Sequence, residues 1–329
     1  MKINARKSVA VLSAVALATA LSACSGGGAE KTDGSSNTGG GGGNSGYTFA
    51  MITHETPGDT FWDRIKAGAQ QAAKDTGSTL KYSADPDATK QAVLIQNAID
   101  SKVDGIATTL VTPEALIPTV KKAVAAGIPV DSFNSGIGFF KEAGSLTHFA
   151  SNEFLGGQGA GERAKADGAT KILCTIQQTG SVALEDRCKG VKDKFPNTEN
   201  IQVNGADDAA VTSAIQAKLS QDKTINWIVT LGAAQGLDAV KAIKQAGSQA
   251  KIGTFDTNPE AAQAVQDGQI QFFIDQQPYL QGYLSIAQLY LYKKNGNILG
   301  GGEAVLTGPS FVDKNNIGQI LPFVKANTR

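Results

Sequence analysis

The sequence predicts an α/β protein with two lobes, each built on a parallel, doubly wound β-sheet. From Tyr47 onward, short apolar runs alternate with longer amphipathic runs, which is the pattern of repeated strand–helix units. The alternation is interrupted once, at NSGIGFFKEAG, and then starts again. The part that carries it, 47–329, has 283 residues, which is large for one core and sufficient for two. Repeated strand–helix units imply right-handed crossovers and helices on both faces of a parallel sheet.

The N-terminal segment predicts export. Three basic residues in the first seven positions precede the apolar run SVAVLSAVALATAL. That run is too short to cross a membrane as a helix and is typical of a signal peptide, here 1–23. It ends in LSAC (21–24), which resembles the lipobox of bacterial lipoproteins. The resemblance implies that Cys24 becomes the lipidated first residue, and an ordinary signal peptide with an incidental cysteine is the alternative.

The following stretch, 24–46, is dominated by Gly and Ser and has no apolar residue beyond Ala29. Such a composition cannot bury a core and behaves as a flexible tether. A lipid anchor on Cys24 followed by a tether predicts an extracytoplasmic domain that is held near a cell membrane.

Charge and cysteine content limit the classes of partner and the chemical state of the cysteines that we expect. The chain has 30 basic and 30 acidic residues, and removal of 1–23 leaves 27 basic against 30 acidic. This balance gives no electrostatic reason to bind nucleic acid, so no nucleic-acid partner is expected. Cys174 and Cys188 remain after Cys24 is assigned to the lipid. In an exported protein such a pair favours a disulfide, and two buried free thiols are the alternative.

The first set of alternating segments predicts four strands and three helices. The helix FWDRIKAGAQQAAKDTG has Trp62, Ile65 and three alanines on one face, and Gly77 is its stop signal. Pro113 opens the third helix. The predicted strands are 47–53, 79–84, 103–110 and 128–133, and the predicted helices are 61–77, 89–102 and 113–127.

The second set starts at SLTHFAS and predicts six strands and five helices. The strands are 145–151, 170–176, 200–205, 225–231, 250–255 and 270–275, and the helices are 154–168, 182–195, 209–222, 234–247 and 259–268. The chain then resumes as a helix over YLQGYLSIAQLYLY, 279–292, which is expected to return to the first lobe.

Ligands of open parallel sheets lie beyond the carboxyl ends of the strands. Polar and aromatic residues gather there in this sequence, and the candidate ligand-binding residues are His54, Asp59, Phe61, Trp62, Asn134, Ser135, Arg187, Asp256 and Gln276. Alternatives stay open for several of them. Asp59 and Asp256 could be helix N-caps, Arg187 could be a solvated helix residue, and one of the two adjacent aromatics could pack on the core.

This mixture of side chains suits a neutral polyhydroxylated ligand. Planar Asp, Asn, Gln and Arg groups can each engage two neighbouring hydroxyls, and aromatic faces can cover the C–H face of a sugar ring. A phosphate would favour a Gly-rich loop with a lysine, and no GxxxxGK[ST] is present. The run GGQGAG (156–161) falls inside a predicted helix, which favours close helix packing over a dinucleotide site.

Catalysis is not indicated. There is no GxSxG, no HExxH and no Cys/His cluster in the sequence, and His54 and His148 are its only histidines. We therefore expect no enzyme activity, no cofactor and no metal site.

The chain resembles the type I periplasmic sugar-binding proteins of ABC transporters, of the ribose-binding type. The resemblance covers 47–329 and is carried by DTFW, VDGIATTLVTP, AAGIPVDSFNSG, SNEFLGGQGAGE, GTFDTNPEAAQAVQDGQI and FFIDQQPYLQGY. It implies two Rossmann-like lobes joined by a three-segment hinge. The implied lobe one is 47–151 plus about 278–308, and lobe two is 152–277 plus about 309–329. The implied crossings lie near Ser151–Glu153, Gln276–Pro278 and Gly308–Phe311.

The resemblance also assigns roles to residues of this chain. Phe61 and Trp62 match the aromatics that cover the sugar ring, and the remaining matches are Arg187, Phe255 with Asp256, and Gln276. The chain departs from the family pattern twice, once at a pair of residues and once at a single residue. Asn134 and Ser135 stand where the family has an Asp–Arg pair, and Gly232 stands where it has an asparagine. His54 has no counterpart in the ribose-binding type, although its place suits a hydroxyl contact.

The function implied is capture of a neutral sugar between the lobes and its delivery to an ABC transporter permease, by a monomer. Inositol or another polyol and the furanose-like autoinducer-2 are alternative ligands, and a lipoprotein that presents its ligand to a sensor is an alternative role. A repressor of the lactose type shares this core, but it needs an N-terminal helix-turn-helix where this chain has a signal peptide and a tether.

Overall fold

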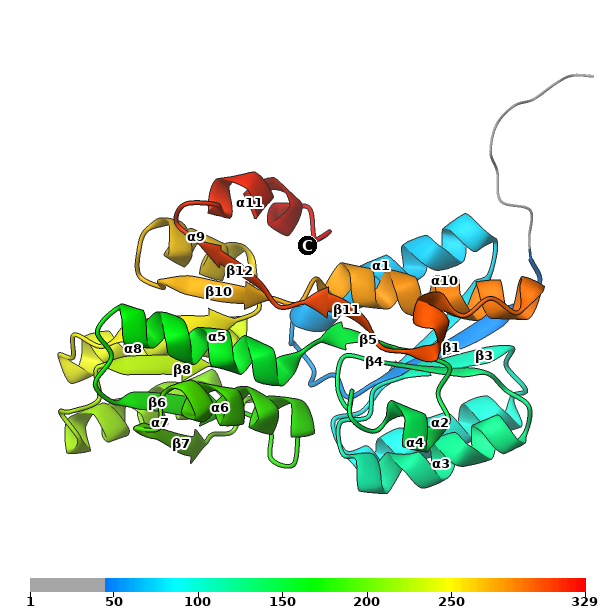
Figure 1. The fold of residues 1–329 in the computed structure, drawn as a ribbon, viewed down its shortest axis with the longest axis horizontal. Coiled ribbons are helices and arrows are strands. Elements are labelled where there is room, and N and C mark those ends of the chain that lie inside the picture. The colour runs from blue at the N-terminus through cyan, green and yellow to red at the C-terminus, as the bar shows by residue number, and fades with distance from the viewer. Residues whose placement is uncertain (1–44) are drawn as a thin grey trace, which may run out of the picture. The chain divides into compact units, whose positions relative to one another are not determined.

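A computed structural model of the chain describes residues 45–329. The predicted signal peptide, Cys24 and nearly all of the tether lie outside the described residues. Within 45–329 the chain forms two six-stranded sheets with helices on both faces, so the predicted α/β class and the two doubly wound lobes are confirmed (Figure 1).

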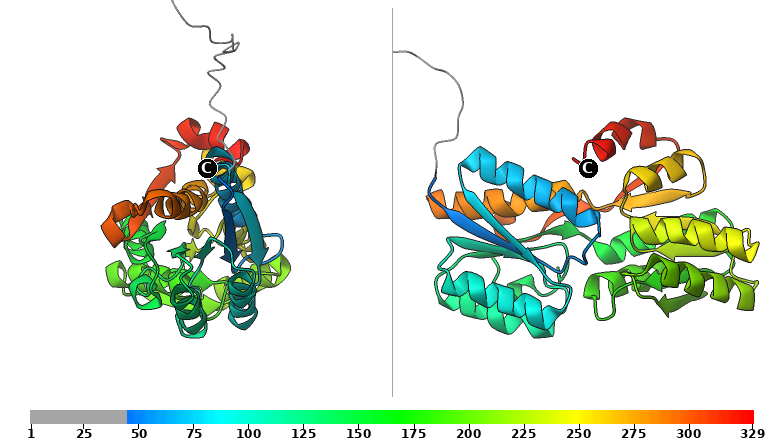
Figure 2. Two further views of the ribbon diagram at one scale, coloured as in Figure 1. Left: turned by 90° about the vertical axis from the view of Figure 1, so that its right-hand side faces the viewer. Right: turned by 180° about the vertical axis from the view of Figure 1, so that it is seen from behind.

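Lobe one is built on a sheet with the strand order β11-β5-β4-β3-β1-β2, and all its strands are parallel. Helices α1 and α10 cover one face of this sheet, and α2, α3 and α4 cover the other (Figures 1 and 2). The strands are β1 Thr48–Thr53, β2 Thr79–Ala84, β3 Gly105–Thr108, β4 Val130–Phe133, β5 His148–Ser151 and β11 Val305–Gly308. The helices are α1 Phe61–Thr76, α2 Ala88–Asp100, α3 Pro113–Ala125, α4 Phe140–Ala143 and α10 Pro278–Asn295.

Lobe two has the corresponding strand order β12-β10-β9-β8-β6-β7, in which only β12 runs antiparallel to its neighbour. Helices α5 and α6 cover one face, and α7, α8, α9 and α11 cover the other. The strands are β6 Ile172–Ile176, β7 Thr198–Gln202, β8 Trp227–Thr230, β9 Lys251–Phe255, β10 Phe272–Asp275 and β12 Ser310–Asp313. The helices are α5 Glu153–Ala166, α6 Val182–Lys194, α7 Asp208–Gln221, α8 Ala233–Ala246, α9 Pro259–Gln266 and α11 Ile317–Lys325.

The sequence patterns missed several short elements. These are α4, the edge strands β11 and β12, the 3₁₀ turn Leu299–Gly302 and the helix α11. A four-residue edge strand has too few alternating positions to give a clear period, and Leu306 of β11 is half-exposed at 53%. The strand predicted over 200–205 is β7, Thr198–Gln202, which is an edge strand with alternating exposure.

Three short segments connect the two sheets. One lies between β5 and α5, a second between β10 and α10, and a third between β11 and β12. They are hydrogen-bonded to one another: the Asn152 amide donates to the Gly308 carbonyl at 3.2 Å, and Nε2 of Gln277 donates to the Thr307 carbonyl at 2.6 Å. Gln277 therefore binds the second crossing to the third.

One pair of helices in each lobe is in direct backbone contact through glycines. In lobe one, a Cβ atom on Gly68 of α1 would lie 2.0 Å from the Tyr279 carbonyl oxygen of α10. In lobe two, a Cβ atom on Gly157 of α5 would lie 2.0 Å from the Arg187 carbonyl oxygen of α6. Neither position has room for any side chain, which explains the Gly-rich run in α5 as close helix packing.

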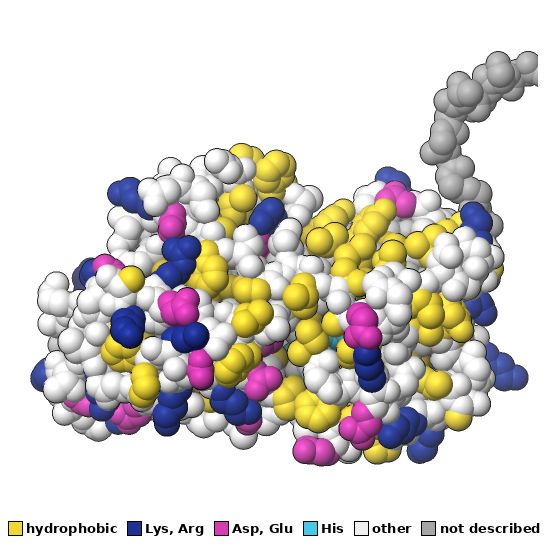
Figure 3. Space-filling view, in the orientation of Figure 1, with side chains coloured by type: hydrophobic (Ala, Val, Ile, Leu, Met, Phe, Trp, Pro, Cys, Tyr) yellow, Lys and Arg dark blue, Asp and Glu magenta, His cyan; other side chains and the backbone are white. Residues whose placement is uncertain are grey.

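The exterior carries no single-sign charge patch on the face that Figure 3 shows, where acidic and basic side chains are interspersed over both lobes. No helix among the described residues combines the length and apolarity that a membrane crossing requires.

Candidate functional site

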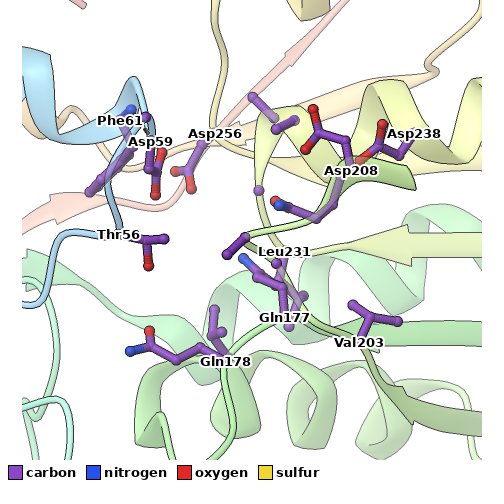
Figure 4. A pocket seen from close by; sticks show the side chains of 18 of the residues that line it. Thr56, Asp59, Phe61, Gln177, Gln178, Val203, Asp208, Leu231, Asp238 and Asp256 are labelled. Atoms are coloured by element: carbon purple, nitrogen blue, oxygen red, sulfur yellow. Dashed lines mark hydrogen bonds between the residues drawn. The ribbon is translucent and has the colours of Figure 1, made fainter. Parts of the chain in front are cut away.

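A cavity of about 1360 Å³ lies between the lobes, where the carboxyl ends of the strands of both sheets face each other. Lobe one lines it with the loop after β1 and with Asn134 after β4. Lobe two lines it with the loops after β6, β7, β8, β9 and β10 (Figure 4). We call this cavity the cleft. It lies where the geometry of open parallel sheets places a ligand.

Eight of the nine predicted ligand-binding residues line the cleft: His54, Asp59, Phe61, Trp62, Asn134, Arg187, Asp256 and Gln276. Their contact with a ligand stays a prediction.

The assignment of Ser135 to the cleft is wrong. Ser135 is fully buried and is absent from the lining of the cleft. Its amide donates to the Phe133 carbonyl, and its own carbonyl accepts from the Leu110 amide at 3.0 Å. The reason lies in the backbone, because Asn134 has a φ of 63° and turns the chain after β4 back into the lobe.

An aromatic wall forms the lobe-one side of the cleft. The Trp62 ring meets Phe61 edge-on at a centroid distance of 5.3 Å, and it meets His54 in the same way at 4.7 Å. Nδ1 of His54 is 2.8 Å from Oγ1 of Thr109, which leaves Nε2 as the ring nitrogen available to a ligand. Burial, with a smaller contribution from the Arg187 charge, lowers the pKa of His54 to about 3. His54 is therefore neutral at physiological pH.

Asp59 is an exposed residue at the edge of this wall. Its Oδ1 accepts a hydrogen bond from the Phe61 amide at 3.0 Å, one residue before the Thr60 N-cap of α1. The carboxylate thus supports the start of α1 and still lines the cleft. Asp59 is therefore not the N-cap itself, which is Thr60, although its carboxylate accepts from the first amide of the helix.

Arg187 is held in a closed set of contacts on the lobe-two side. Its Nε donates to Oε2 of Glu153 at 2.5 Å and its Nη1 donates to the Leu231 carbonyl at 2.8 Å. The guanidinium also lies 4.3 Å over the Phe255 ring. Arg187 and Glu153 are each only 3% exposed, so the alternative of a solvated arginine is wrong. Burial raises the pKa of Glu153, and the charge and hydrogen bond of Arg187 oppose that rise.

Asp256 contacts both Arg187 and Gln276, and Gln276 lies beside the second crossing. Its Oδ1 accepts from Nε2 of Gln276 at 2.6 Å, and its Oδ2 lies 3.7 Å from Nη1 of Arg187. Asp256 is not a helix N-cap, because Asn258 caps α9 through a 2.7 Å bond to the Ala261 amide. Burial raises the pKa of Asp256 to about 7, although Arg187 and Gln276 act to lower it.

Three residues that follow strands facing the cleft adopt left-handed backbone conformations. Asn134, Asp256 and Gln277 have φ values of 63°, 60° and 55°. This region is uncommon for residues with a side chain, and strained backbone of this kind clusters at functional sites. The Asn134 side chain is fixed by a 3.3 Å bond from its Nδ2 to Oε1 of Gln281 in α10.

Cys174 and Cys188 are joined by a disulfide, with their Cα atoms 5.9 Å apart. The bond links β6 to α6, and α6 also carries Arg187. The disulfide therefore fixes α6, which carries Arg187, to β6, the strand directly before Gln177.

The candidate set did not include every residue of the cleft. Gln177 and Gln235 also line it, as does Gly232, the position where the resemblance expects an asparagine. Glu153 binds Arg187 without lining the cleft. Gln177 follows a strand directly, which was a usable signal. Gln235 lies in the first turn of a helix, and the sequence does not indicate that it faces the cleft. Within 45–329 there is no cluster of three or more His, Cys, Asp or Glu residues that could hold a metal ion.

A family model described as periplasmic binding protein domain matches residues 49–297. Among solved structures, a carbohydrate transporter from Acidothermus cellulolyticus 11B in complex with myo-inositol is 52% identical to this chain. The match covers 86% of this chain and 99% of that one, with a TM-score of 0.85.

Curated relatives are more distant. The xylose/arabinose-binding protein XylF of Sulfolobus acidocaldarius is 26% identical over 69% of this chain, and the match spans 61% of the length of XylF. The ribose import binding protein RbsB of Haemophilus influenzae is 27% identical over 72% of this chain and 82% of that protein.

Proposed function

Because this chain belongs to the periplasmic binding protein domain family, we propose that it captures a neutral cyclic polyol in the cleft, outside the cytoplasm, and delivers it to an ABC transporter permease. The first candidate ligand is myo-inositol, which is bound in the 52% identical structure. A pentose or hexose is the second candidate, because the named relatives bind or import ribose, xylose and arabinose.

The observation that carries this proposal is an excess of hydrogen-bond acceptors beside an aromatic wall. Oε1 of Gln276 and Oε1 of Gln177 are buried and have no hydrogen-bond partner within the described residues. Asp59 and Asp256 add carboxylate oxygens to the same cleft. A buried acceptor without a partner is costly, and the hydroxyl groups of a polyol supply the missing donors. The Trp62 and Phe61 rings can cover the apolar face of the same ligand.

The division of these groups between the lobes supports a closing motion. His54 and Trp62 belong to lobe one, whereas Arg187 and Asp256 belong to lobe two, and three short segments join the lobes. A ligand that contacts both sets binds the closed arrangement better than the open one, and it shifts the population toward closure by that difference. The closed protein is then the form that docks on the permease. We expect binding without turnover.

The test is a screen of the purified protein against cyclitols, pentoses, hexoses and amino acids, by thermal shift and then by calorimetry. Specific binding raises the melting temperature in a concentration-dependent manner. We expect myo-inositol to give the largest shift and to be recovered intact by mass spectrometry. The proposal is wrong if only a charged ligand, such as an amino acid, stabilises the protein, or if the bound polyol is chemically converted.

We also expect binding to tighten as the pH rises from 6 to 8. A ligand hydroxyl donates to the ionised form of Asp256, whose pKa is about 7. At pH 6 most of this carboxyl is protonated, so the dissociation constant should be about tenfold higher than at pH 8. Calorimetric titrations at these pH values measure the change. His54 cannot cause it, because the pKa of His54 is about 3.

The matched control for the pH dependence is Asp256→Asn, which should bind weakly with a flat pH profile. The unliganded protein should show the opposite trend in stability. The folded pKa of Asp256 is raised above its unfolded value, so this group favours folding below about pH 4, and that contribution is lost as the pH rises toward 7. An unchanged pH profile in Asp256→Asn would assign the effect to another group.

We propose further that a lipid on Cys24 anchors the protein to the outer side of the cell membrane and that it acts as a monomer. In cells, Cys24→Ser should move the protein from the membrane fraction to the soluble fraction or the medium. Retention of the variant in the membrane fraction would contradict lipid anchoring. Size-exclusion chromatography with light scattering tests the monomer.

A further inference from the structure

Gln177 lies at the lobe-two side of the cleft, directly after β6. The side chain of Gln177 lines the cleft beside Leu231, and Figure 4 shows both side chains close together in the pocket. The neutral amide of Gln177 forms no side-chain hydrogen bond to another described residue through its oxygen, whereas Arg187 and Asp256 are both held by side-chain partners.

Two glycines make the position of this side chain possible. The Gly205 amide donates to the Gln177 carbonyl at 3.1 Å, and a Cβ atom on Gly205 would lie 2.7 Å from Cβ of Gln177. A Cβ atom on Gly232 would lie 2.4 Å from Oε1 of Gln235 and 3.1 Å from Nε2 of Gln177. The absence of a side chain at Gly232 therefore leaves the space into which the two amides converge.

The oxygen of the Gln177 amide is buried and has no hydrogen-bond partner within the described residues. Arg187 donates to Glu153 and to the Leu231 carbonyl and forms no hydrogen bond to this oxygen. A buried amide oxygen without a donor is costly. A ligand that places a hydroxyl hydrogen at this point removes that cost, whereas a ligand that places an ether oxygen there adds a second unpaired acceptor.

We infer that Gln177 is a specificity-determining residue, whose amide oxygen accepts a hydrogen bond from one ring hydroxyl and so favours a cyclitol over a pyranose. The inference rests on the proposed polyol-binding function. A cyclitol such as myo-inositol carries a hydroxyl on all six ring positions. A pyranose has an ether oxygen at one of its six, and that oxygen has no hydrogen to donate. The amide oxygen of Gln276 is a second acceptor without a partner in the cleft. A pyranose must satisfy both oxygens with hydroxyls, which limits the orientations that keep its ring oxygen away from Gln177.

The first test compares Gln177→Leu with the wild-type protein by calorimetry, using myo-inositol and D-glucose. Leucine has a similar volume and no acceptor. We expect the affinity for myo-inositol to fall by about tenfold or more and the preference for myo-inositol over D-glucose to shrink. The matched control is Gln263→Leu on the exposed side of α9, where the glutamine contacts only Asp267 through its side chain. This control should leave both affinities unchanged.

The second test uses the series of monodeoxy-inositols, each of which lacks one hydroxyl. Wild-type protein should lose affinity for the member that lacks the hydroxyl bound by Gln177. Gln177→Leu should bind that member and myo-inositol with equal affinity, because neither ligand then has a partner there. Gly232→Ala is an independent variant that displaces Gln235 and crowds Gln177 from the other side, and it should reduce the same preference.

The outcomes separate this inference from the proposed function. If wild-type protein binds neither a cyclitol nor a sugar, both are overturned. If wild-type protein binds myo-inositol and Gln177→Leu binds it with the same affinity, only the role of Gln177 is overturned. A loss that is equal for myo-inositol, D-glucose and every deoxy-inositol would show that Gln177 acts only in packing, and it would overturn the inference as well.

Discussion

Replacing Arg187 with methionine is expected to destabilise the protein by about 3–5 kcal/mol and to remove ligand binding. Arg187 is the partner of Glu153, and both side chains are almost fully buried. Without the guanidinium, the Glu153 carboxylate is left buried and unpaired next to the first hinge crossing, and one of its oxygens has no other partner within the described residues. Urea unfolding measures the stability, and calorimetry with the best ligand from the screen measures the binding.

The double variant Arg187→Met with Glu153→Gln separates the two effects. The double variant removes the unpaired carboxylate, so most of the lost stability should return. Ligand binding should not return, because the guanidinium of Arg187 is still absent from the cleft. If the single variant is as stable as wild type, the Arg187–Glu153 contact is not a structural ion pair. If the double variant binds normally, Arg187 is not a ligand-binding residue.

Replacing Trp62 with alanine is the second large effect that we expect. Trp62 is 3% exposed and packs between His54, Phe61 and the core of lobe one, so its removal should cost about 3–5 kcal/mol of stability. It should also weaken ligand binding, because His54 and Phe61 lose the ring that holds them at the edge of the cleft. The affinity is measured by calorimetry below the melting temperature of the variant.

Trp227 offers a matched control for this substitution. It is the second tryptophan of the chain, is 1% exposed, and stacks on Phe272 in lobe two without lining the cleft. Trp227→Ala should therefore lose a comparable amount of stability while its folded fraction binds the ligand with wild-type affinity. Equal losses of affinity in both variants would show that Trp62 acts through the fold alone.

The resemblance to the sugar-binding family predicted the positions of all three crossings, and the sequence itself marks two of them by the end of a strand and the start of a helix. The third, between β11 and β12, has no such mark, because the sequence patterns missed both strands. Ser151 ends β5 before Glu153 begins α5, and Asp275 ends β10 before Pro278 begins α10. Proline has a fixed φ and lacks an amide donor, so it suits the first turn of a helix, and it marks the second crossing in the sequence itself.

The direction of individual side chains was less predictable. Asn134 and Ser135 are adjacent after the same strand, but the left-handed φ of Asn134 separates them, and only Asn134 reaches the cleft. Residue type alone does not reveal such a backbone reversal. The burial of Arg187 was hidden for a related reason, since its partner Glu153 is 34 positions away and the contact forms only when α5 packs on α6.

The helix pairs in backbone contact have a mechanical consequence. Gly68 brings α1, which carries Trp62, against the first turn of α10, and Gly157 brings the first turn of α5 against α6 at Arg187. A layer of side chains between two helices can yield by changing rotamers, but two peptide backbones in contact cannot. Trp62 and Arg187, which line the cleft, and the helices that start at the crossings are therefore parts of one stiff body in each lobe. For a ligand bound between the lobes, the coordinate that these contacts leave free is the angle between the two bodies.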